Sequence, residues 1–249
     1  MAGFVTAVNR HAQPPVAADT PQAARRRMGT LGADEGFRMN PNVRPSWYER
    51  RVLPYLIDIV CGIGPVRRQR RKVVPLAHGR VLEIGIGTGL NFEHYDKAKV
   101  ERIVGLDPGL EMHRLARKRV KRAGLAVELV GLSAEQIPYQ DATFDTVLVT
   151  YSLCTIPDPA AALKEMRRVL TPSGKLIFCE HGLAPDASVR RWQNRLTPLW
   201  AKLAGGCHLN RDIPGLLREA GFHSADMQSM YLPGPRPLTY NYWGTAATV

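Results

Sequence analysis

The stretch from Val81 to Gly89, VLEIGIGTG, decides the fold of this chain. An apolar run typical of a buried strand leads directly into three glycines at alternate positions, Gly85, Gly87 and Gly89. Glycine adopts backbone conformations that other residues avoid, and it lets a bound molecule approach the main chain where a side chain would collide. The stretch therefore predicts a strand, a tight ligand-binding turn and then a helix.

Short apolar runs alternate with helical patterns on both sides of this turn. The expected strands are 81–84, 102–107, 126–130, 144–150, 175–181, 226–232 and 239–247. The expected helices are 91–95, 110–122, 159–170, 189–203 and 213–220. Such alternation is typical of βαβ units on a parallel sheet. We predict a single doubly wound α/β domain of seven strands, with helices on both faces of the sheet.

The segment before this domain differs in composition and charge. The 249 residues contain 34 Lys and Arg against 22 Asp and Glu, a net charge of +12. Residues 1–75 hold 13 of the basic and 5 of the acidic residues, hence +8. A basic front end is compatible with nucleic acid, anionic lipid, an acidic ligand or simple solubility. The four cysteines form no CxxC pair, which favours a reducing, cytoplasmic setting.

Two parts are expected ahead of the sheet. Residues 1–45 show no helical or strand periodicity, so we predict a flexible leader. Residues 46–249 form the predicted domain, and its first segment, 46–76, is expected to be a helical lid. No window of 18 apolar residues occurs. The apolar stretch 52–64 is interpreted as a core helix with a basic flank, or alternatively as a helix lying on a membrane surface.

The next polar signal identifies the class of ligand. Asp107 ends an apolar run 18 residues after Gly89, where a carboxylate can accept both hydroxyls of a ribose. A dinucleotide site requires GxGxxG, but Leu90 stands at the sixth position, and no GxxxxGK[ST] motif for phosphate occurs. Glu83, two residues before the first glycine, suits a cationic ligand such as S-adenosylmethionine. Alternatively, Glu83 pairs with a basic neighbour, and Asp107 caps the following helix.

Four segments resemble the class I S-adenosylmethionine-dependent methyltransferases, in the branch that includes quinone-biosynthesis enzymes. They are EIGIGTG (83–89), GLDPGLEM (105–112) and the stretches 133–156 and 165–181. The resemblance implies a Rossmann-like sheet and S-adenosylmethionine as cosubstrate, with the glycines under its methionine part and Asp107 on its ribose. It further implies a lining of Pro108, Met112, Ser133, Ala134, Glu135 and Thr150. Ser133 departs from the family, which usually has Asp there for the adenine amino group.

The acceptor of the methyl group must be inferred from the residues that surround the expected cosubstrate site. Nucleic-acid amino methyltransferases place an NPPY-like tetrad after the fourth strand, whereas this chain has Thr150-Tyr151-Ser152-Leu153. Nucleic acid is therefore not favoured. The segments 180–222 and 230–246 resemble the alkyl-thiol methyltransferases related to the methyltransferase-like 7 proteins. That resemblance implies a small thiol substrate, and because the apolar anchor of the mammalian members is missing, we expect a soluble enzyme.

A thiol acceptor needs only mild activation, because a free thiol with a pKa of about 8.5 is partly ionised at neutral pH. His181, at the end of the fifth strand, is the first candidate for a substrate-side role. Its alternative is a structural hydrogen bond. The further acceptor-side candidates are His208, Arg211, Tyr48 and Tyr151. For Arg211 the alternative is a salt bridge to Asp212 or Glu180, and for Tyr48 it is packing.

Three rival interpretations remain open at this stage. Methyl transfer itself requires no metal, but Cys154, Cys179 and Cys207 invite a mechanism in which thiolates hold a soft acceptor such as arsenite. A quinone precursor or phospholipid headgroup at a membrane surface is a second possible acceptor, favoured by the stretch 52–64. The third rival is a noncatalytic cofactor-binding protein. The tryptophans, Trp192 among them, are expected in the core, and the sequence indicates no oligomeric state.

Overall fold

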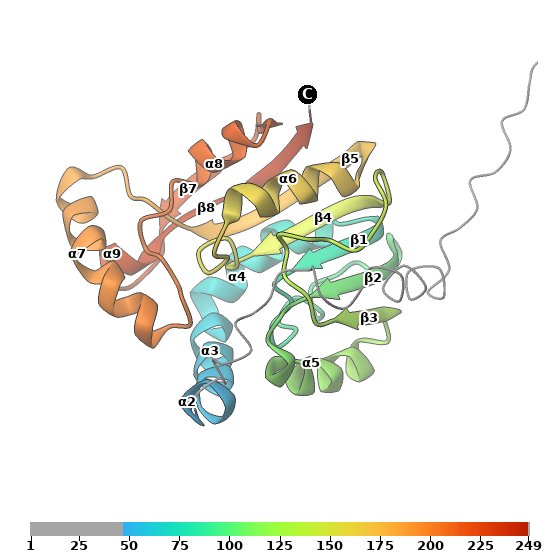
Figure 1. The fold of residues 1–249 in the computed structure, drawn as a ribbon, viewed down its shortest axis with the longest axis horizontal. Coiled ribbons are helices and arrows are strands. Elements are labelled where there is room, and N and C mark those ends of the chain that lie inside the picture. The colour runs from blue at the N-terminus through green and yellow to red at the C-terminus, as the bar shows by residue number, and fades with distance from the viewer. Residues whose placement is uncertain (1–46, 249) are drawn as a thin grey trace, which may run out of the picture. The chain divides into compact units, whose positions relative to one another are not determined.

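The sheet organises the part of the chain that the computed structural model describes, residues 47–248 without the side chain of Glu49. These residues fall within one compact unit, 39–249, and the predicted leader, 1–45, lies outside them. The strand order is β3-β2-β1-β4-β5-β8-β6, with β7 paired to β8 (Figure 1). The strands are β1 (Gly79–Ile84), β2 (Val100–Leu106), β3 (Val127–Val130), β4 (Phe144–Thr150), β5 (Leu170–His181), β6 (Phe222–His223), β7 (Gln228–Tyr231) and β8 (Tyr240–Thr248).

The described sheet has eight strands instead of the predicted seven because one edge strand is interrupted. Both β6 and β7 pair antiparallel with β8, through Ala247–Thr248 and Tyr240–Trp243 respectively. Between these pairings, residues 224–227 face residues 244–246, four residues against three, which is a bulge. The Asp226 carboxylate fills the gap by accepting hydrogen bonds from the Thr245 backbone N–H (2.9 Å) and hydroxyl (3.0 Å).

The helices follow the predicted alternation with one exception. They are α2 (Trp47–Arg51), α3 (Leu53–Gly62), α4 (Gly64–Val73), the 3-10 helix η1 (Val74–Leu76), α5 (Leu110–Ala123), α6 (Pro159–Val169), α7 (Ala187–Leu203), α8 (Ile213–Glu219) and α9 (Arg236–Thr239). The helix predicted for 91–95 is wrong, because the chain forms turns there. Asn91 and Asp96 are short polar residues that favour turns over helix, and Asp96 accepts a hydrogen bond from the Ala98 N–H.

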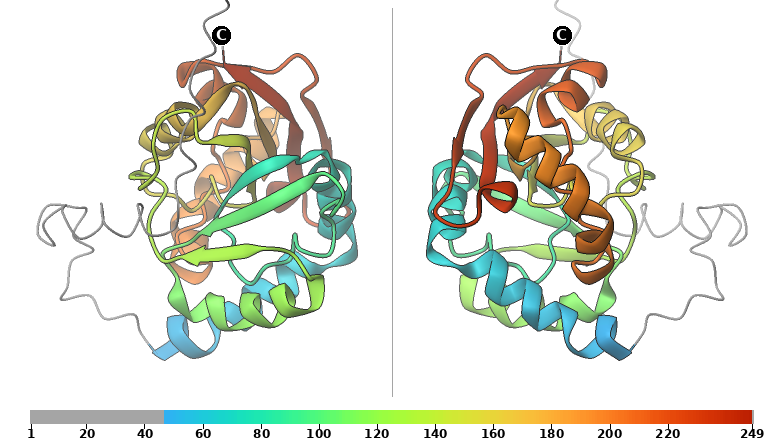
Figure 2. Two further views of the ribbon diagram at one scale, coloured as in Figure 1. Left: turned by 90° about the vertical axis from the view of Figure 1, so that its right-hand side faces the viewer. Right: turned by 90° about the vertical axis from the view of Figure 1, so that its left-hand side faces the viewer.

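Two buried clusters confirm the doubly wound arrangement. On one face, Leu82, Val147 and Phe178 pack with Leu163 of α6 and Leu217 of α8. On the other face, alternate strand residues pack with α5, α4 and η1, and they include Val81, Leu148 and Ile177. Figure 2 shows the sheet between α6 and α4. The period-two alternation of strand side chains explains why neighbours in sequence belong to opposite clusters.

The N-terminal helices correct one expectation. The core helix predicted over 52–64 buries Leu53 and Pro54, whereas Leu56, Ile59, Val60 and Ile63 are 44–68% exposed. Asp58 fixes α3 to the domain, because its carboxylate binds both Nη atoms of Arg119 (2.7 and 3.0 Å) and accepts from the Thr88 hydroxyl (2.5 Å). Polar contacts therefore hold the helix, and among the described residues none covers its apolar face. None of the described helices is both long and apolar enough to cross a bilayer.

Candidate active site

The glycine turn follows β1, as predicted. Gly85, Gly87 and Gly89 have φ angles of 65°, 50° and 81°, in the left-handed region that side chains disfavour. A Cβ at Gly85 would lie 2.1 Å from the Ser152 hydroxyl oxygen, so no larger residue fits without a shift. At Gly87 the nearest atom to such a Cβ is the Met112 sulfur, at 3.6 Å. The turn thus exposes bare main chain beside Met112, a cradle suited to a ligand.

Asp107 closes this cradle from the end of the neighbouring strand, β2. Its carboxylate accepts hydrogen bonds from the N–H groups of Gly87 (2.8 Å) and Gly109 (2.7 Å). Burial raises the pKa of Asp107, and these two hydrogen bonds oppose that rise. The alternative in which Asp107 caps a helix is wrong, because α5 begins at Leu110 with Gly109 at its cap. A half-buried carboxylate aligned by the turn can still accept from ribose hydroxyls.

Glu83 is buried and hydrogen-bonded within the chain. Its carboxylate accepts hydrogen bonds from the Asn91 amide (2.9 Å) and the Tyr95 hydroxyl (2.7 Å), and the side chain is 2% exposed. Burial raises its pKa to about 7. The positive charge of Arg70 opposes this rise. The structure therefore ties Glu83 to Asn91 and Tyr95, and its contact with the cosubstrate stays a prediction.

Arg70 is a buried charged residue beside the site that the sequence did not single out. It is 6% exposed, and its Nη1 donates to the Thr150 hydroxyl (2.5 Å) and the Asn91 side-chain oxygen (2.8 Å). Its guanidinium also lies over the Tyr151 ring, 5.0 Å from the centroid. A signal was available within the basic run, because Val66, Arg70 and Val73 share one helical stripe. The predicted cofactor residue Thr150 is thus tied to the N-terminal helices.

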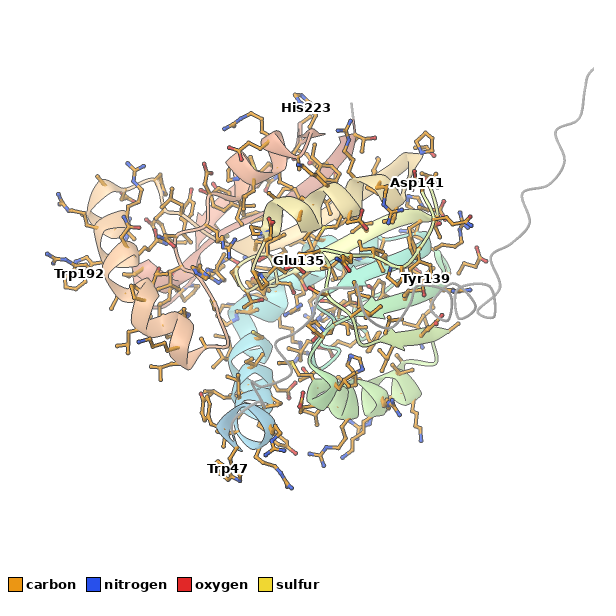
Figure 3. All side chains as sticks on the ribbon, viewed as in Figure 1. Trp47, Glu135, Tyr139, Asp141, Trp192 and His223 are labelled. Atoms are coloured by element: carbon orange, nitrogen blue, oxygen red, sulfur yellow. The ribbon has the colours of Figure 1, made fainter. Side chains whose placement is uncertain are left out.

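The residues predicted near adenine lie around the ends of β2 and β3. Pro108 is exposed and Met112 half-buried, while Ala134 is 5% exposed within the core. The Ser133 hydroxyl donates to the Glu135 carboxylate, and Glu135 accepts from the Asp158 N–H (3.3 Å). Figure 3 shows Glu135 close to the middle of the sheet edge. The Ser133 hydroxyl is therefore already hydrogen-bonded to Glu135, and this contact stabilises the loop.

A cavity of about 580 Å³ lies beside the turn, between α3, α4 and α5. Gly89 is the predicted cofactor residue at its wall. Its cationic lining comprises Arg67, Arg70, Lys97, Arg119 and Arg122. Arg67 pairs with Glu93, and Arg119 pairs with Asp58, so these pairs cancel part of the positive charge. The cavity borders the cradle and does not include Asp107.

The acceptor-side candidate His181 meets two cysteines. His181 Nε2 lies 3.1 Å from the Cys207 sulfur, and the Trp200 indole N–H donates to the same sulfur (3.3 Å). The Cys154 sulfur joins them, so that the ligand-type atoms of Cys154, His181 and Cys207 all lie within 4.8 Å of one another. All three side chains come from connections or strand ends at the carboxyl edge of β4 and β5, where such sheets bind ligands.

Electrostatics couples these three groups. The hydrogen bond with Cys154 lowers the pKa of the Cys207 thiol, against burial and together with contacts from His181 and Trp200. The same bond and complete burial raise the pKa of Cys154. Burial lowers the pKa of His181, but its hydrogen bond and attraction to Cys207 raise it overall. The arrangement favours a thiolate on Cys207 beside a protonated imidazole, with Cys154 as a neutral thiol.

The other acceptor-side candidates have structural partners. His208 donates from Nδ1 to the Gly206 carbonyl (2.7 Å), and Arg211 donates to the Ile156 carbonyl (2.9 Å). The salt bridge considered for Arg211 is replaced by this backbone contact, because Asp212 instead accepts from the Gly215 N–H (3.1 Å) and caps α8. The Tyr48 hydroxyl donates to the Leu203 carbonyl (3.0 Å), which ties α2 to the end of α7. Their roles toward a substrate stay predictions.

Tyr151 directly follows β4 and has a strained backbone conformation. Its φ of 52° lies in the left-handed region, and its hydroxyl donates to the Asn241 side-chain oxygen (2.7 Å). Cys179 lies 3.6 Å from this hydroxyl and outside the cluster. The proposed trio of Cys154, Cys179 and Cys207 is therefore not assembled, since His181 takes the third place.

One tryptophan also departs from expectation. Trp192 projects outward from α7 and is 55% exposed (Figure 3), so its prediction as a core residue is wrong. The next residue, Gln193, is buried instead and donates a hydrogen bond to the Gly182 carbonyl (3.0 Å). The buried stripe of α7 is thus partly polar, and the large aromatic residue faces outward.

Comparison with known proteins agrees with the fold. Residues 82–178 match the Methyltransferase domain family. The thiol S-methyltransferase TMT1B of Rattus norvegicus is 32% identical over 158 residues, covering 62% of this chain and 64% of that protein. For the Homo sapiens protein of the same name, identity is 33% over 170 residues, covering 66% and 67%. The chain thus spans about two thirds of the length of these relatives.

A relative with a different acceptor and a solved structure complete the comparison. The phosphatidylethanolamine N-methyltransferase of Cereibacter sphaeroides is 34% identical over 117 residues, covering 46% of this chain and 57% of that protein. The structure of an S-adenosylmethionine-dependent methyltransferase from Thermotoga maritima, described as a possible histamine N-methyltransferase, has a TM-score of 0.56 at 23% identity. It covers 81% of this chain and 98% of that chain, and supports the fold alone. The chain belongs to the class I S-adenosylmethionine-dependent methyltransferases, whose cosubstrate is S-adenosylmethionine.

Proposed function

We propose that this chain transfers the methyl group of S-adenosylmethionine to a small thiol such as hydrogen sulfide, methanethiol or an alkyl thiol. The products are methanethiol or a thioether, and S-adenosylhomocysteine. The observation that carries this proposal is the contact of His181 with Cys207 (3.1 Å) at the carboxyl edge of the sheet. The relatives named thiol S-methyltransferase support the same class of acceptor.

In this proposal the glycine turn and Asp107 hold the cosubstrate. Gly85 and Gly87 leave room for its methionine part, and Asp107, already oriented by the Gly87 N–H, accepts from the ribose hydroxyls. Met112 borders the same space. S-adenosylmethionine supplies an electrophilic methyl group on a sulfonium. The protein's task is then to align the acceptor with that methyl group and to exclude water.

His181 is the proposed positioning group for the acceptor sulfur. It already binds one sulfur, that of Cys207, and a substrate sulfur beside it would accept the same type of hydrogen bond. Such a bond favours the thiolate form, which is the nucleophile. Arg70, buried over the Tyr151 ring, adds a fixed positive charge near the same edge. All four cysteines are free, which suits the reducing cytoplasm that we propose as its location.

A second candidate is methylation of a phospholipid headgroup or quinone precursor at a membrane surface. Large apolar side chains are exposed on three helices, among them Trp47 (69%), Ile59 (68%) and Leu199 (62%). Arg50 and Arg51 follow Trp47 on α2, and basic residues beside an apolar face attract anionic lipid. The phosphatidylethanolamine N-methyltransferase relative supports this alternative.

Release of S-adenosylhomocysteine tests the two candidates in one experiment. The purified chain receives S-adenosylmethionine with sulfide, methanethiol, a quinone precursor or a phosphatidylethanolamine dispersion, and mass spectrometry identifies the products. We expect saturable formation of methanethiol from sulfide and of dimethyl sulfide from methanethiol. Turnover with the amphiphiles and none with thiols would contradict the thiol proposal. Sedimentation with anionic liposomes then measures whether the exposed apolar face docks.

A further inference from the structure

The cluster of Cys154, His181 and Cys207 is assembled from three separate segments. Cys154 lies in the turn after β4, His181 ends β5, and Cys207 lies between α7 and α8. Their three donor atoms lie within 4.8 Å of one another. Within the described residues, both cysteines are free. Two sulfurs and one imidazole nitrogen meeting at one point form a possible set of metal ligands.

The distances suit a tetrahedral ion of the size of zinc. Bonds of about 2.3 Å to sulfur and about 2.1 Å to nitrogen place neighbouring ligands of a tetrahedron about 3.6–3.8 Å apart. The separation of His181 Nε2 and Cys207 Sγ is 3.1 Å, and no two of the three atoms are more than 4.8 Å apart. Small side-chain rotations would therefore bring all three atoms into coordination distance.

The donor chemistry selects the class of ion. Thiolate and imidazole ligands suit zinc and similar borderline-soft ions, whereas magnesium and calcium require oxygen ligands. Two cysteine thiolates would also cancel the charge of a divalent ion inside the protein. Trivalent arsenic prefers thiolates, and the third position here is a nitrogen, so the set favours zinc.

The surrounding hydrogen bonds hold the two cysteines in place. The His208 backbone N–H donates to the Cys154 carbonyl (2.9 Å), which joins the two cysteine-bearing loops. The Trp200 N–H donates to the Cys207 sulfur (3.3 Å). The buried Glu180 carboxylate accepts from the Ser152 N–H (2.7 Å) and fixes the turn that carries Cys154. Such outer contacts orient metal ligands before the ion binds.

We propose that Cys154, His181 and Cys207 bind one zinc ion and that the acceptor thiol occupies its fourth position. This inference rests on the proposed thiol methylation for the identity of the fourth ligand. Three protein ligands with one open position are the pattern of catalytic zinc sites. Cys154 is 2% exposed, while His181 and Cys207 are half-buried.

With zinc bound, the ion and not His181 would stabilise the negative charge of the acceptor thiolate. A thiol loses its proton when it coordinates zinc, and that proton leaves to solvent. The bound sulfur then attacks the methyl group, so that a new sulfur–carbon bond forms while the sulfonium–methyl bond breaks. The electron pair of the broken bond stays on the departing sulfur, which becomes neutral. The products are a methylated thiol and S-adenosylhomocysteine, with one proton released.

Metal stoichiometry tests the site without any activity measurement. The full chain is stripped with a chelator, incubated with Zn²⁺, separated from free ion and analysed by mass spectrometry of the metal. We expect one zinc per chain, and an affinity at least about 100-fold lower in Cys207→Ser and His181→Ala. Cys179→Ser is the matched control, since Cys179 lies outside the cluster, and it should keep one zinc. Absence of stoichiometric zinc in the wild-type chain would overturn the proposal.

Cobalt substitution tests the fourth position separately. Co²⁺ in the wild-type chain should show thiolate charge-transfer absorption, and methanethiol should change the spectrum without S-adenosylmethionine present. A spectrum that does not respond to methanethiol would overturn the assignment of the acceptor. Full thiol methylation by zinc-free protein would overturn the zinc proposal while leaving the proposed function intact. Bound zinc and thiol with no methylated product would instead contradict the proposed function alone.

Discussion

The proposed cosubstrate region and the proposed acceptor region of this protein are built on different principles. The cosubstrate region, residues 83–89 and 107–112, uses the main chain: left-handed glycines and backbone N–H groups that orient Asp107. The acceptor region uses side chains: Cys154, His181 and Cys207 meet from three connections. Local backbone conformation determines the cosubstrate region. The acceptor region forms only when the sheet and its edge helices have folded.

This difference predicts which kind of substitution disrupts each region. A main-chain cradle fails when a side chain is added, because the backbone conformation and the space above it are both lost. A side-chain cluster fails when a donor is removed, and the sheet beneath it can remain. Substitutions should therefore separate the binding of S-adenosylmethionine from the transfer of its methyl group.

The largest effect is expected from Gly85→Ala. The new Cβ would lie 2.1 Å from the Ser152 hydroxyl oxygen at a φ of 65°, so the turn must shift. We expect the free energy of unfolding to fall by about 2 kcal/mol, with loss of measurable S-adenosylmethionine binding. Denaturant unfolding and titration calorimetry measure the two effects. Gly64→Ala, where the nearest atom is 3.8 Å away, is the control, and equal behaviour of both variants would remove the turn from the site.

His181→Ala should affect the other region. Because His181 contacts the Cys207 sulfur and not the glycine turn, we expect turnover with methanethiol to fall about 100-fold. Affinity for S-adenosylmethionine should stay within about twofold of wild type, well under 1.4 kcal/mol. His223→Ala removes an exposed histidine from β6 (Figure 3) and serves as the control. Normal turnover of His181→Ala would return His181 to a purely structural role.

Asp107→Ala should weaken the cosubstrate complex without unfolding the chain. The substitution removes the carboxylate that receives the Gly87 and Gly109 N–H groups. We expect affinity for S-adenosylmethionine to fall more than about tenfold, or about 1.4 kcal/mol, by titration calorimetry. Asp141→Ala, at an exposed salt bridge with Arg168, should leave the affinity unchanged. If Asp107→Ala bound as tightly as wild type, Asp107 would lie outside the site.

Glu83 should give the stability of the chain a distinct pH dependence. Burial raises its pKa from 4.5 to about 7, so the folded chain binds more protons than the unfolded chain between these values. The free energy of unfolding should therefore fall as the pH rises from 4.5 to 7, by up to about 3 kcal/mol for this group. Glu83→Gln should lack that contribution. Parallel pH profiles of the two proteins in denaturant unfolding would contradict the assignment.

The sequence predicted the fold wherever a signal was local. The strand 144–150 has its predicted bounds, and the glycine turn and Asp107 occupy their predicted places at the ends of β1 and β2. The prediction of a helix over 91–95 was wrong because so short a segment has no periodicity that distinguishes a helix from turns. The edge strand predicted over 226–232 is instead divided into β6 and β7, because a one-residue bulge depends on pairing with β8, which no local pattern encodes.

The acceptor region was less predictable because its contacts are long-range. His181 was chosen from its place at a strand end, but its partner Cys207 is 26 residues away. The sequence did not indicate that Arg70 is buried, because it stands in a basic run whose other members are mostly exposed. Its partner Thr150 is 80 residues away. A buried arginine becomes evident only when the helix that carries it packs against the sheet.

Transfer of a labelled methyl group tests the central claim most directly. The chain receives S-adenosylmethionine with a deuterated methyl group together with methanethiol, and gas-phase mass spectrometry follows dimethyl sulfide. The account predicts trideuterated dimethyl sulfide in equal amount to S-adenosylhomocysteine, and its strong reduction in His181→Ala at unchanged cosubstrate affinity. Unchanged methanethiol, with no labelled dimethyl sulfide formed, would contradict the assignment of a thiol acceptor to this site.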